Sequence, residues 1–434
     1  MKAPIREFLR LMIATSAIVL ATACGGGGNG VTSGSTSSGS GSGGSGTPVN
    51  NTVQMSVDLG PATFVAAGNA NEDVPFVSVT ICVPGTTNCA TVDHVEIDTG
   101  SEGLRLLNTA FNLSLPQQTI NGNPVGECVQ FADSTFSWGP VQTADIQVAG
   151  ETAKAVPIQV INGSFQTIPT TCSNGGSGVN DMFSLGANGI LGVGPFRQDC
   201  GGSCVNSAVP GTYYACNNGA CTSTAESLTA QLQNPVWMFP SDNNGVILQF
   251  PSVSDSGQAA PVLGSLIFGI GTQSNNGLGS ATVLPIDSGR GNFSVQFQGT
   301  TFNDNSFIDS GSNGFFFLDS ATLANQFGVT IPDCPKSSIA NGFYCPGSIT
   351  PISVSMLGVS SSGSTPLGAA RAVTFNIANA QTLFSSPNFA AFDDVGGENS
   401  GSFDFGLPFF FGKSVYTAIE GQSTPAGTGP YFAF

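Results

Sequence analysis

The chain has 434 residues, which is long enough for two lobes with their own cores, and a formal net charge of −17 with only 10 Lys and Arg residues. So acidic a chain repels nucleic acid and lacks a broad basic surface for anionic lipids, which excludes both as binding partners of the folded part.

The N-terminal segment is predicted to be an export signal. A basic start precedes a short apolar stretch over residues 11–23, which is too short for a convincing membrane-spanning helix. The stretch ends directly before Cys24 and resembles a bacterial lipoprotein signal peptide, residues 1–23, with Cys24 as the lipidated residue. Residues 24–47 are almost all Gly, Ser and Thr and predict a flexible tether. We expect a lipid anchor in the bacterial cell envelope, at the outer membrane because Gly25 follows the cysteine; an ordinary secretory signal is the alternative.

The rest of the chain is predicted to be all-β with few short helices. Strands are indicated at 52–59, 76–82, 144–149, 158–161, 246–250 and 293–297, where Pro157 suits a strand start. Ser223 and Glu226 predict a capped helix that ends at Asn234, and residues 320–327 predict a second, with Gly328 after its end. We expect an N-terminal lobe over residues 48–255 and a related C-terminal lobe over residues 256–434.

Ten cysteines remain after Cys24, and an even number in an exported chain predicts five disulfides. They are Cys82, Cys89, Cys128, Cys172, Cys200, Cys204, Cys216, Cys221, Cys334 and Cys345. The first two and the last two are near neighbours with turn residues between them. The four from 200 to 221 can pair internally in three ways; a zinc site is the less favoured alternative, because thiols outside the cytoplasm oxidise.

Two tetrapeptides carry the chemistry of the chain. They are Asp98-Thr99-Gly100-Ser101 and Asp309-Ser310-Gly311-Ser312, and apolar residues stand on both sides of each. Their likeness indicates two related lobes that each deliver one carboxylate to a shared site. Two close carboxylates cannot both ionise easily, so one keeps a proton while the other acts as a base.

From about residue 50 to its end the chain resembles the pepsin-like aspartic peptidases. The resemblance rests on the two tetrapeptides, on 188–194 beneath the first Asp loop, on the flap-like segment 131–135 with its return strand 145–150, and on 405–418. It implies a bilobal acid-protease fold in which Asp98 and Asp309 are catalytic. The chain also resembles an uncharacterised group of bacterial lipoproteins.

The same resemblance gives each neighbouring residue a role. Gly100 and Gly311 permit tight turns. The Thr99 and Ser310 hydroxyls bind the opposite loop, and those of Ser101 and Ser312 donate to the adjacent carboxylate. Flap residues Phe131, Asp133 and Ser134 contact the substrate.

Two positions depart from that pattern. Phe131 stands where the family has a tyrosine, and Arg105 places a cation where the family often has an aromatic residue. We therefore expect an aspartic endopeptidase that hydrolyses peptides or unfolded protein, as a monomer without metal or cofactor. One alternative is an inactive relative that binds peptide or an envelope component, and another is a surface adhesin or structural lipoprotein.

Overall fold

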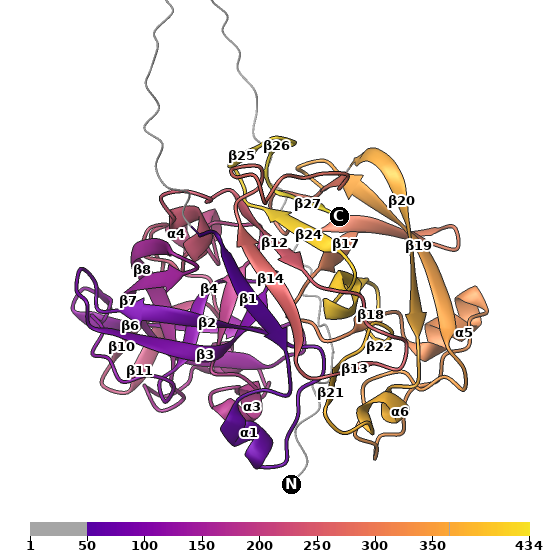
Figure 1. Cartoon of the computed structure of the whole chain (residues 1–434). Helices are drawn as coiled ribbons and strands as arrows, with labels where there is room; N and C mark the ends of the chain where they lie inside the picture. The colour runs from indigo at the N-terminus through magenta and orange to yellow at the C-terminus, as the bar shows by residue number, and fades with distance from the viewer. Residues whose placement is uncertain (1–49, 364) are drawn as a thin grey trace, which may run out of the picture. The chain divides into compact units, whose positions relative to one another are not determined.

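Strands make up most of the regular structure in the computed structural model, which describes residues 50–363 and 365–434. The predicted signal peptide, Cys24 and the whole of the predicted tether lie outside the described residues. Within the described part, the expectation of a mostly β protein with few short helices is confirmed (Figure 1).

The strands up to residue 268 are β1 (Thr52–Val57), β2 (Pro75–Cys82), β3 (Cys89–Asp98), β4 (Glu102–Leu107), β5 (Thr119–Ile120), β6 (Asn123–Gln130), β7 (Phe136–Val148), β8 (Glu151–Ile161), β9 (Gly189–Val193), β10 (Tyr213–Asn217), β11 (Ala220–Ser223), β12 (Gly245–Gln249), β13 (Gln258–Ala259) and β14 (Val262–Phe268). Those that follow are β15 (Val283–Pro285), β16 (Phe293–Phe297), β17 (Thr300–Ile308), β18 (Phe315–Phe317), β19 (Thr350–Val359), β20 (Pro366–Ile377), β21 (Phe389–Ala391), β22 (Gly396–Glu398), β23 (Asp404–Phe405), β24 (Ser414–Ala418), β25 (Ser423–Thr424), β26 (Gly427–Thr428) and β27 (Tyr431–Ala433). The helices are α1 (Ala62–Ala66), α2 (Thr170–Ser173), α3 (Met182–Leu185), α4 (Gly202–Asn206), α5 (Ser320–Phe327) and α6 (Ala380–Phe384), with 3-10 turns η1 (Pro235–Met238) and η2 (Leu407–Phe410).

Six strands of the first half close into a mixed barrel in the order β2, β3, β9, β4, β8 and β7, because β7 also pairs with β2. The barrel forms because alternate side chains along these strands are apolar and point to one side. In β2, for example, Val77, Val79 and Ile81 all lie in the main hydrophobic core.

A second sheet contains the strands β20, β19, β16, β17, β23, β18 and β22 in that order. A further run of strands joins the first sheet, in which β1 pairs with β14 and the sheet continues through β12, β24, β27 and β15. Figure 1 shows this run beside the barrel strands, with indigo β1 next to β14. Residues from both sides of position 255 therefore share one sheet.

The two halves repeat one arrangement of four strands. In the first half the order is β3, β9, β4 and β8, where β9 is parallel to β3 and antiparallel to β4, and β8 is parallel to β4. In the second half β17, β23, β18 and β22 have the same order and the same directions. Leu191 of β9 lies between Ile97 and Leu104, and Phe405 of β23 has the matching neighbours in β17 and β18. The repeat places Asp98 and Asp309 at corresponding strand ends.

Two local predictions are wrong. Residues 223–232 form no helix, because Ser223 ends β11 opposite Tyr214 and the Glu226 carboxylate accepts from the next amide, Ser227. Pro157 lies inside β8 rather than before a strand. It is tolerated there because the strand bulges just before it, with Ala155 at φ 51°. Helix α5, with Gly328 in a left-handed conformation after its end, is as predicted.

All five predicted disulfides are present. The pairs are Cys82–Cys89, Cys128–Cys172, Cys200–Cys204, Cys216–Cys221 and Cys334–Cys345. The cluster from 200 to 221 therefore forms two disulfides, and the zinc alternative for these four thiols is wrong. Five disulfides indicate an extracytoplasmic compartment. Among the described residues, no helix has the length and apolarity needed to cross a membrane.

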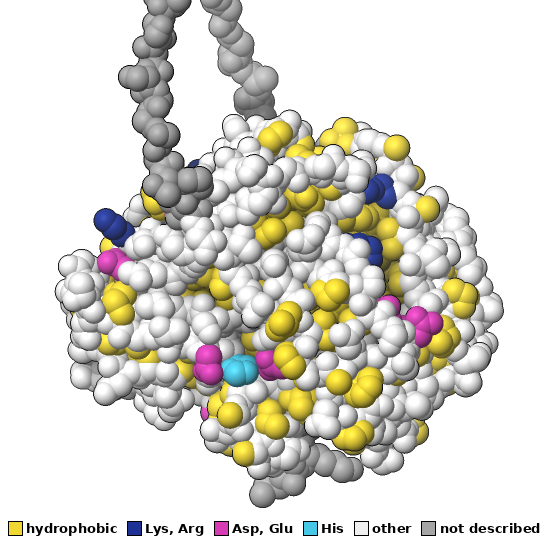
Figure 2. All heavy atoms as spheres, in the orientation of Figure 1, with side chains coloured by type: hydrophobic (Ala, Val, Ile, Leu, Met, Phe, Trp, Pro, Cys, Tyr) yellow, Lys and Arg dark blue, Asp and Glu magenta, His cyan; other side chains and the backbone are white. Residues whose placement is uncertain are grey.

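Charged side chains are sparse on the face drawn in Figure 2, in line with the 9% of charged residues in the sequence. The single His of the chain, His94, lies between the carboxylates of Asp58 and Asp93, at 3.4 and 3.2 Å. It takes no part in the site described next.

Candidate active site

Reciprocal hydrogen bonds join the two Asp loops at their second residues. The Thr99 amide donates to the Ser310 hydroxyl at 3.1 Å, and the Ser310 amide donates to the Thr99 hydroxyl at 2.9 Å. Each hydroxyl donates in turn to the strand that precedes the other loop, Ser310 to the Ile97 carbonyl at 2.7 Å and Thr99 to the Ile308 carbonyl at 3.4 Å. Both residues are fully buried, so these bonds fix the two loops relative to each other.

The glycines of the two loops let the carboxylates approach closely. A Cβ on Gly100 would lie 2.6 Å from the Asp309 carboxyl carbon, and a Cβ on Gly311 would lie 2.9 Å from Asp98 Oδ1. Each carboxylate therefore lies against the glycine of the opposite loop, where a side chain would displace it. The predicted pair, Asp98 and Asp309, is brought together in the structure.

Local donors orient each carboxyl in the same way. The amides of Gly100 and Gly311 donate to Oδ1 of the preceding Asp at 2.7 and 2.8 Å. The Ser101 hydroxyl donates to Asp98 Oδ2, and the Ser312 hydroxyl lies 3.0 Å from Asp309 Oδ2. Burial raises the pKa of Asp309 well above its usual range, and the neighbouring Asp98 carboxylate adds to that shift.

The pair lines a cleft of about 500 Å³, a volume typical of small-molecule or peptide side-chain sites. Charged residues gather in it although the chain has few: Glu96, Asp98, Glu102, Arg105, Asp133, Asp199, Arg290 and Asp309. Phe131, Ala132, Asp133 and Thr135 form one wall. Ser134, predicted to contact substrate, is not among the lining residues; it occupies the turn of this hairpin at φ 66°.

The hairpin turn is held by short bonds of its own. The Phe131 amide donates to the Thr135 carbonyl at 2.8 Å, and Asp133 accepts from the Thr135 amide at 2.9 Å and from its hydroxyl at 2.6 Å. The Phe131 ring packs at the edge of an apolar cluster that includes Leu185 and Ile190. This wall of the cleft is thus a hydrogen-bonded hairpin turn with a defined conformation.

Strand β6, which leads into this hairpin, is anchored on one face by a buried ion pair. Arg105 of β4 donates to Glu127 Oε1 at 3.1 Å and to the Glu102 carbonyl at 2.8 Å, and its guanidinium lies 3.7 Å from Asp199. The Tyr213 hydroxyl contacts both Asp199 oxygens at 2.7 and 2.8 Å. The Arg105 side chain is thus occupied by these partners, and its charge is directed at them.

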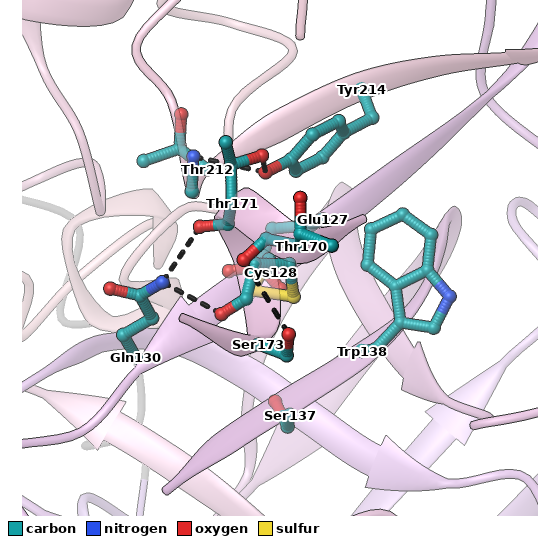
Figure 3. The surroundings of a disulfide bond; sticks show 12 residues. Glu127, Cys128, Gln130, Ser137, Trp138, Thr170, Thr171, Ser173, Thr212 and Tyr214 are labelled. Atoms are coloured by element: carbon teal, nitrogen blue, oxygen red, sulfur yellow. Dashed lines mark hydrogen bonds between the residues drawn. A yellow bond between two sulfur atoms is a disulfide. The ribbon is translucent and has the colours of Figure 1, made fainter. Parts of the chain in front are cut away.

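On its other face β6 is anchored by a disulfide, because successive strand residues point to opposite sides. Cys128 is bonded to Cys172, and Gln130 donates to the carbonyls of Thr171 and Cys172 at 2.9 and 2.7 Å (Figure 3). Trp138 of β7 stands directly opposite Cys128 and packs in the same cluster. Both faces of the strand before the hairpin are therefore fixed.

A family model matches residues 47–434, which is nearly the whole chain, and its description reads "Protein of unknown function (DUF3443)". The chain belongs to the DUF3443 family. No curated protein matches it.

Several residues of this DUF3443 site were not predicted from the sequence. Glu127 and Asp199 bind Arg105, and Glu102 accepts from the Phe196 amide at 3.1 Å within the cleft. Asp404, the first residue of β23, lies beside the second loop, with Oδ2 2.7 Å from the Ser312 hydroxyl. Residues 188–194 were predicted from the sequence to lie beneath the first Asp loop. Matching this segment to the second half of the chain could have placed Asp404 beside the second Asp loop.

We predict that the DUF3443 domain is most stable at acid pH. Burial raises the pKa of Glu102 to about 8, helped by the charges of Asp98 and Asp199, and raises the pKa values of Glu72, Asp199 and Asp394 to about 7. The folded protein then binds more protons than the unfolded chain between about pH 4 and pH 8, so the free energy of unfolding falls as pH rises through that window. The loss is on the order of several kcal/mol, since one pKa unit corresponds to about 1.4 kcal/mol.

Urea unfolding at pH 4.5, 6 and 7.5 measures this slope. Glu102→Gln keeps the shape of the side chain but cannot titrate, so the free energy of unfolding of this variant should fall less steeply with pH. A stability that rises steadily from acid to neutral pH would show that these buried carboxyls are not protonated in the folded state.

Proposed function

We propose that the chain is an aspartic endopeptidase with a bilobal, pepsin-like architecture, acting on extended peptides or unfolded protein. The observation that supports this most directly is the reciprocal bonding of Thr99 and Ser310, which holds two carboxylates face to face in a cleft. The repeated four-strand arrangement supports a two-lobed origin, since each copy delivers one carboxylate from the same position.

The proposed reaction needs one ionised and one protonated carboxyl. Asp98 takes a proton from a water held between the two groups as the water attacks the peptide carbonyl carbon. Asp309, whose raised pKa keeps its proton, gives that proton to the carbonyl oxygen. The C–N bond of the tetrahedral intermediate then breaks as Asp98 passes the proton it accepted to the leaving amine, and Asp309 takes back a proton from the hydroxyl that becomes the carbonyl oxygen of the new carboxylic acid.

A second candidate, an inactive protein that binds peptide in the same cleft, is favoured by Phe131. Phe131 lines the cleft, and in the aspartic peptidases that the sequence resembles this position carries a tyrosine whose hydroxyl helps order the site, so the phenyl ring here lacks that hydroxyl. Both candidates predict peptide binding, so hydrolysis separates them.

The test is a digestion of unfolded, reduced and alkylated protein by the purified protein between pH 2 and pH 8, with fragments read by mass spectrometry. Asp255→Asn, which changes an exposed carboxylate, is the matched control for the active-site variants. New fragment ends that depend on Asp98 support the peptidase. Tight peptide binding without new ends at any pH would favour the binding protein.

We further propose that Cys24 carries a lipid and anchors the domain in the outer membrane through the Gly/Ser tether. The sequence of the leader and tether supports this. Mass spectrometry of the mature N-terminus should find an acylated Cys24, and an unmodified N-terminus at or near this position would rule the anchor out.

A further inference from the structure

The second Asp loop has a carboxyl neighbour, Asp404, at a position where the first loop has Ile190. Asp404 is 2% exposed, and its Oδ2 lies 2.7 Å from the Ser312 hydroxyl oxygen, which in turn lies 3.0 Å from Asp309 Oδ2. Asp309, Ser312 and Asp404 therefore form a row in which one hydroxyl lies between two carboxyls.

That hydroxyl cannot donate to both carboxyls, because it has a single hydrogen. The shorter of its two contacts is the one to Asp404. If the hydrogen points to Asp404, the Ser312 oxygen offers Asp309 only lone pairs, and a hydrogen bond between them then requires a proton on Asp309.

The first loop provides the comparison. Ser101 occupies the position of Ser312 and donates to Asp98. The residue that corresponds to Asp404 precedes Leu191 just as Asp404 precedes Phe405, and it is Ile190. Ile190 has no acceptor, so no carboxylate competes for the Ser101 hydrogen from that position. The two loops therefore differ in one respect. Ser101 donates to Asp98, whereas the Ser312 hydroxyl lies within hydrogen-bonding distance of both Asp309 and Asp404.

The other residues around Asp404 do not remove this difference between the two loops. Strand β18 is three phenylalanines, and η2 contains only Leu, Pro and Phe. Asp304 of β17 is paired with Arg290, Glu398 at the end of β22 is exposed, and Lys413 donates to the Phe409 carbonyl. After burial, the charges of Asp98 and Asp404 contribute most to the raised pKa of Asp309.

We propose that Asp404 is a positioning residue that holds the Ser312 hydrogen and thereby makes Asp309 the proton donor and Asp98 the proton acceptor of the pair. This inference rests on the proposed function for its catalytic meaning, but the direction of the hydroxyl is a property of the resting protein. In each turnover Asp309 loses one proton to the substrate and regains one before the next, while Ser312 keeps its own.

The test is a titration of the Asp carboxyl carbons by ¹³C NMR in the full mature protein, with the Asp309 signal assigned by its loss in Asp309→Asn. In Asp404→Ile, which installs the residue of the first loop, no acceptor at this position competes for the Ser312 hydrogen. In Asp404→Asn the competing acceptor loses its charge, so donation to Asp309 is favoured. The pKa of Asp309 should fall by at least about one unit in both variants. An unchanged Asp309 titration in variants that keep the wild-type melting temperature would overturn the proposal.

A double-mutant cycle separates the hydroxyl from the bare charge of Asp404. In a Ser312→Ala background, Asp404→Asn should shift the Asp309 titration by less than half as much as it does with Ser312 present. A shift of full size without Ser312 would overturn the proposed role of the hydroxyl. Because the readout is a chemical shift, the titration tests Asp404 even in a protein that hydrolyses nothing, an outcome that would count against the proposed function alone. In an active protein, the alkaline limb of the kcat/KM profile should move to lower pH by the same amount.

Discussion

Replacing either Asp98 or Asp309 by Asn is expected to lower kcat/KM for peptide hydrolysis by a factor on the order of 10³ or more. Neither carboxyl can serve as both acid and base in one step, so loss of one disables the pair. Asn keeps the size of the side chain and can accept the same Gly100 or Gly311 amide bond, which limits the effect to proton transfer. The double variant should be no slower than the worse single variant, because residues that act as a unit are not additive.

Steady-state kinetics on a fluorogenic peptide, with each variant at the wild-type optimum, measures this effect. Asp255→Asn should stay within twofold of wild type. Unfolding curves confirm that the active-site variants are folded, and the Thr99–Ser310 bonds they retain make a large loss of stability unexpected. Variants at 98 or 309 that keep more than a tenth of wild-type activity would remove the pair from the mechanism.

Replacing Arg105 by Met is expected to lower the free energy of unfolding by about 3–5 kcal/mol at neutral pH. The side chain is 1% exposed and faces Glu127, also 1% exposed, and Asp199. Without the guanidinium, Glu127 and Asp199 remain buried next to each other with no cation between them. Both must then take up protons or open the structure to water, and either costs stability.

The control is the double variant Arg105→Met/Glu127→Gln, which removes the cation and one carboxylate together. It should recover part of the lost stability, because one buried uncompensated charge is gone. The single variant should also lose less free energy of unfolding at pH 4.5 than at pH 7.5, because Glu127 and Asp199 take up protons more easily at the lower pH. An Arg105→Met variant within about 1 kcal/mol of wild type at pH 7.5 would show that the ion pair does not hold strand β6.

The residues predicted well are those whose role depends on local sequence. The two Asp loops were identified because each motif lies between apolar strand segments, and the Gly in each is required by the contact with the opposite carboxyl. Helix α5 followed from its residue pattern and from Gly328. These features depend on neighbours within a few positions along the chain.

The residues that were missed depend on pairings between distant strands. Glu127 and Asp199 meet Arg105 only because the fold brings β4, β6 and the segment after β9 next to one another. Asp404 reaches Ser312 only because β23 inserts between β17 and β18. The predicted helix after Ser223 failed for the same reason, since pairing of β11 with β10 outweighed the capping pattern. Sequence spacing alone carries no information on such contacts.

The decisive measurement for the proposed Asp98–Asp309 pair is the pH dependence of kcat/KM for one defined peptide, with Asp98→Asn and Asp309→Asn alongside wild type. We predict a bell-shaped wild-type profile with its maximum below neutral pH. The rate falls at high pH as Asp309, with its raised pKa, loses its proton, and falls at low pH as the pair becomes fully protonated. Both Asn variants should stay near the background rate at every pH. Hydrolysis that persists in either variant, or a wild-type rate that keeps rising through neutral pH, would contradict the proposed mechanism.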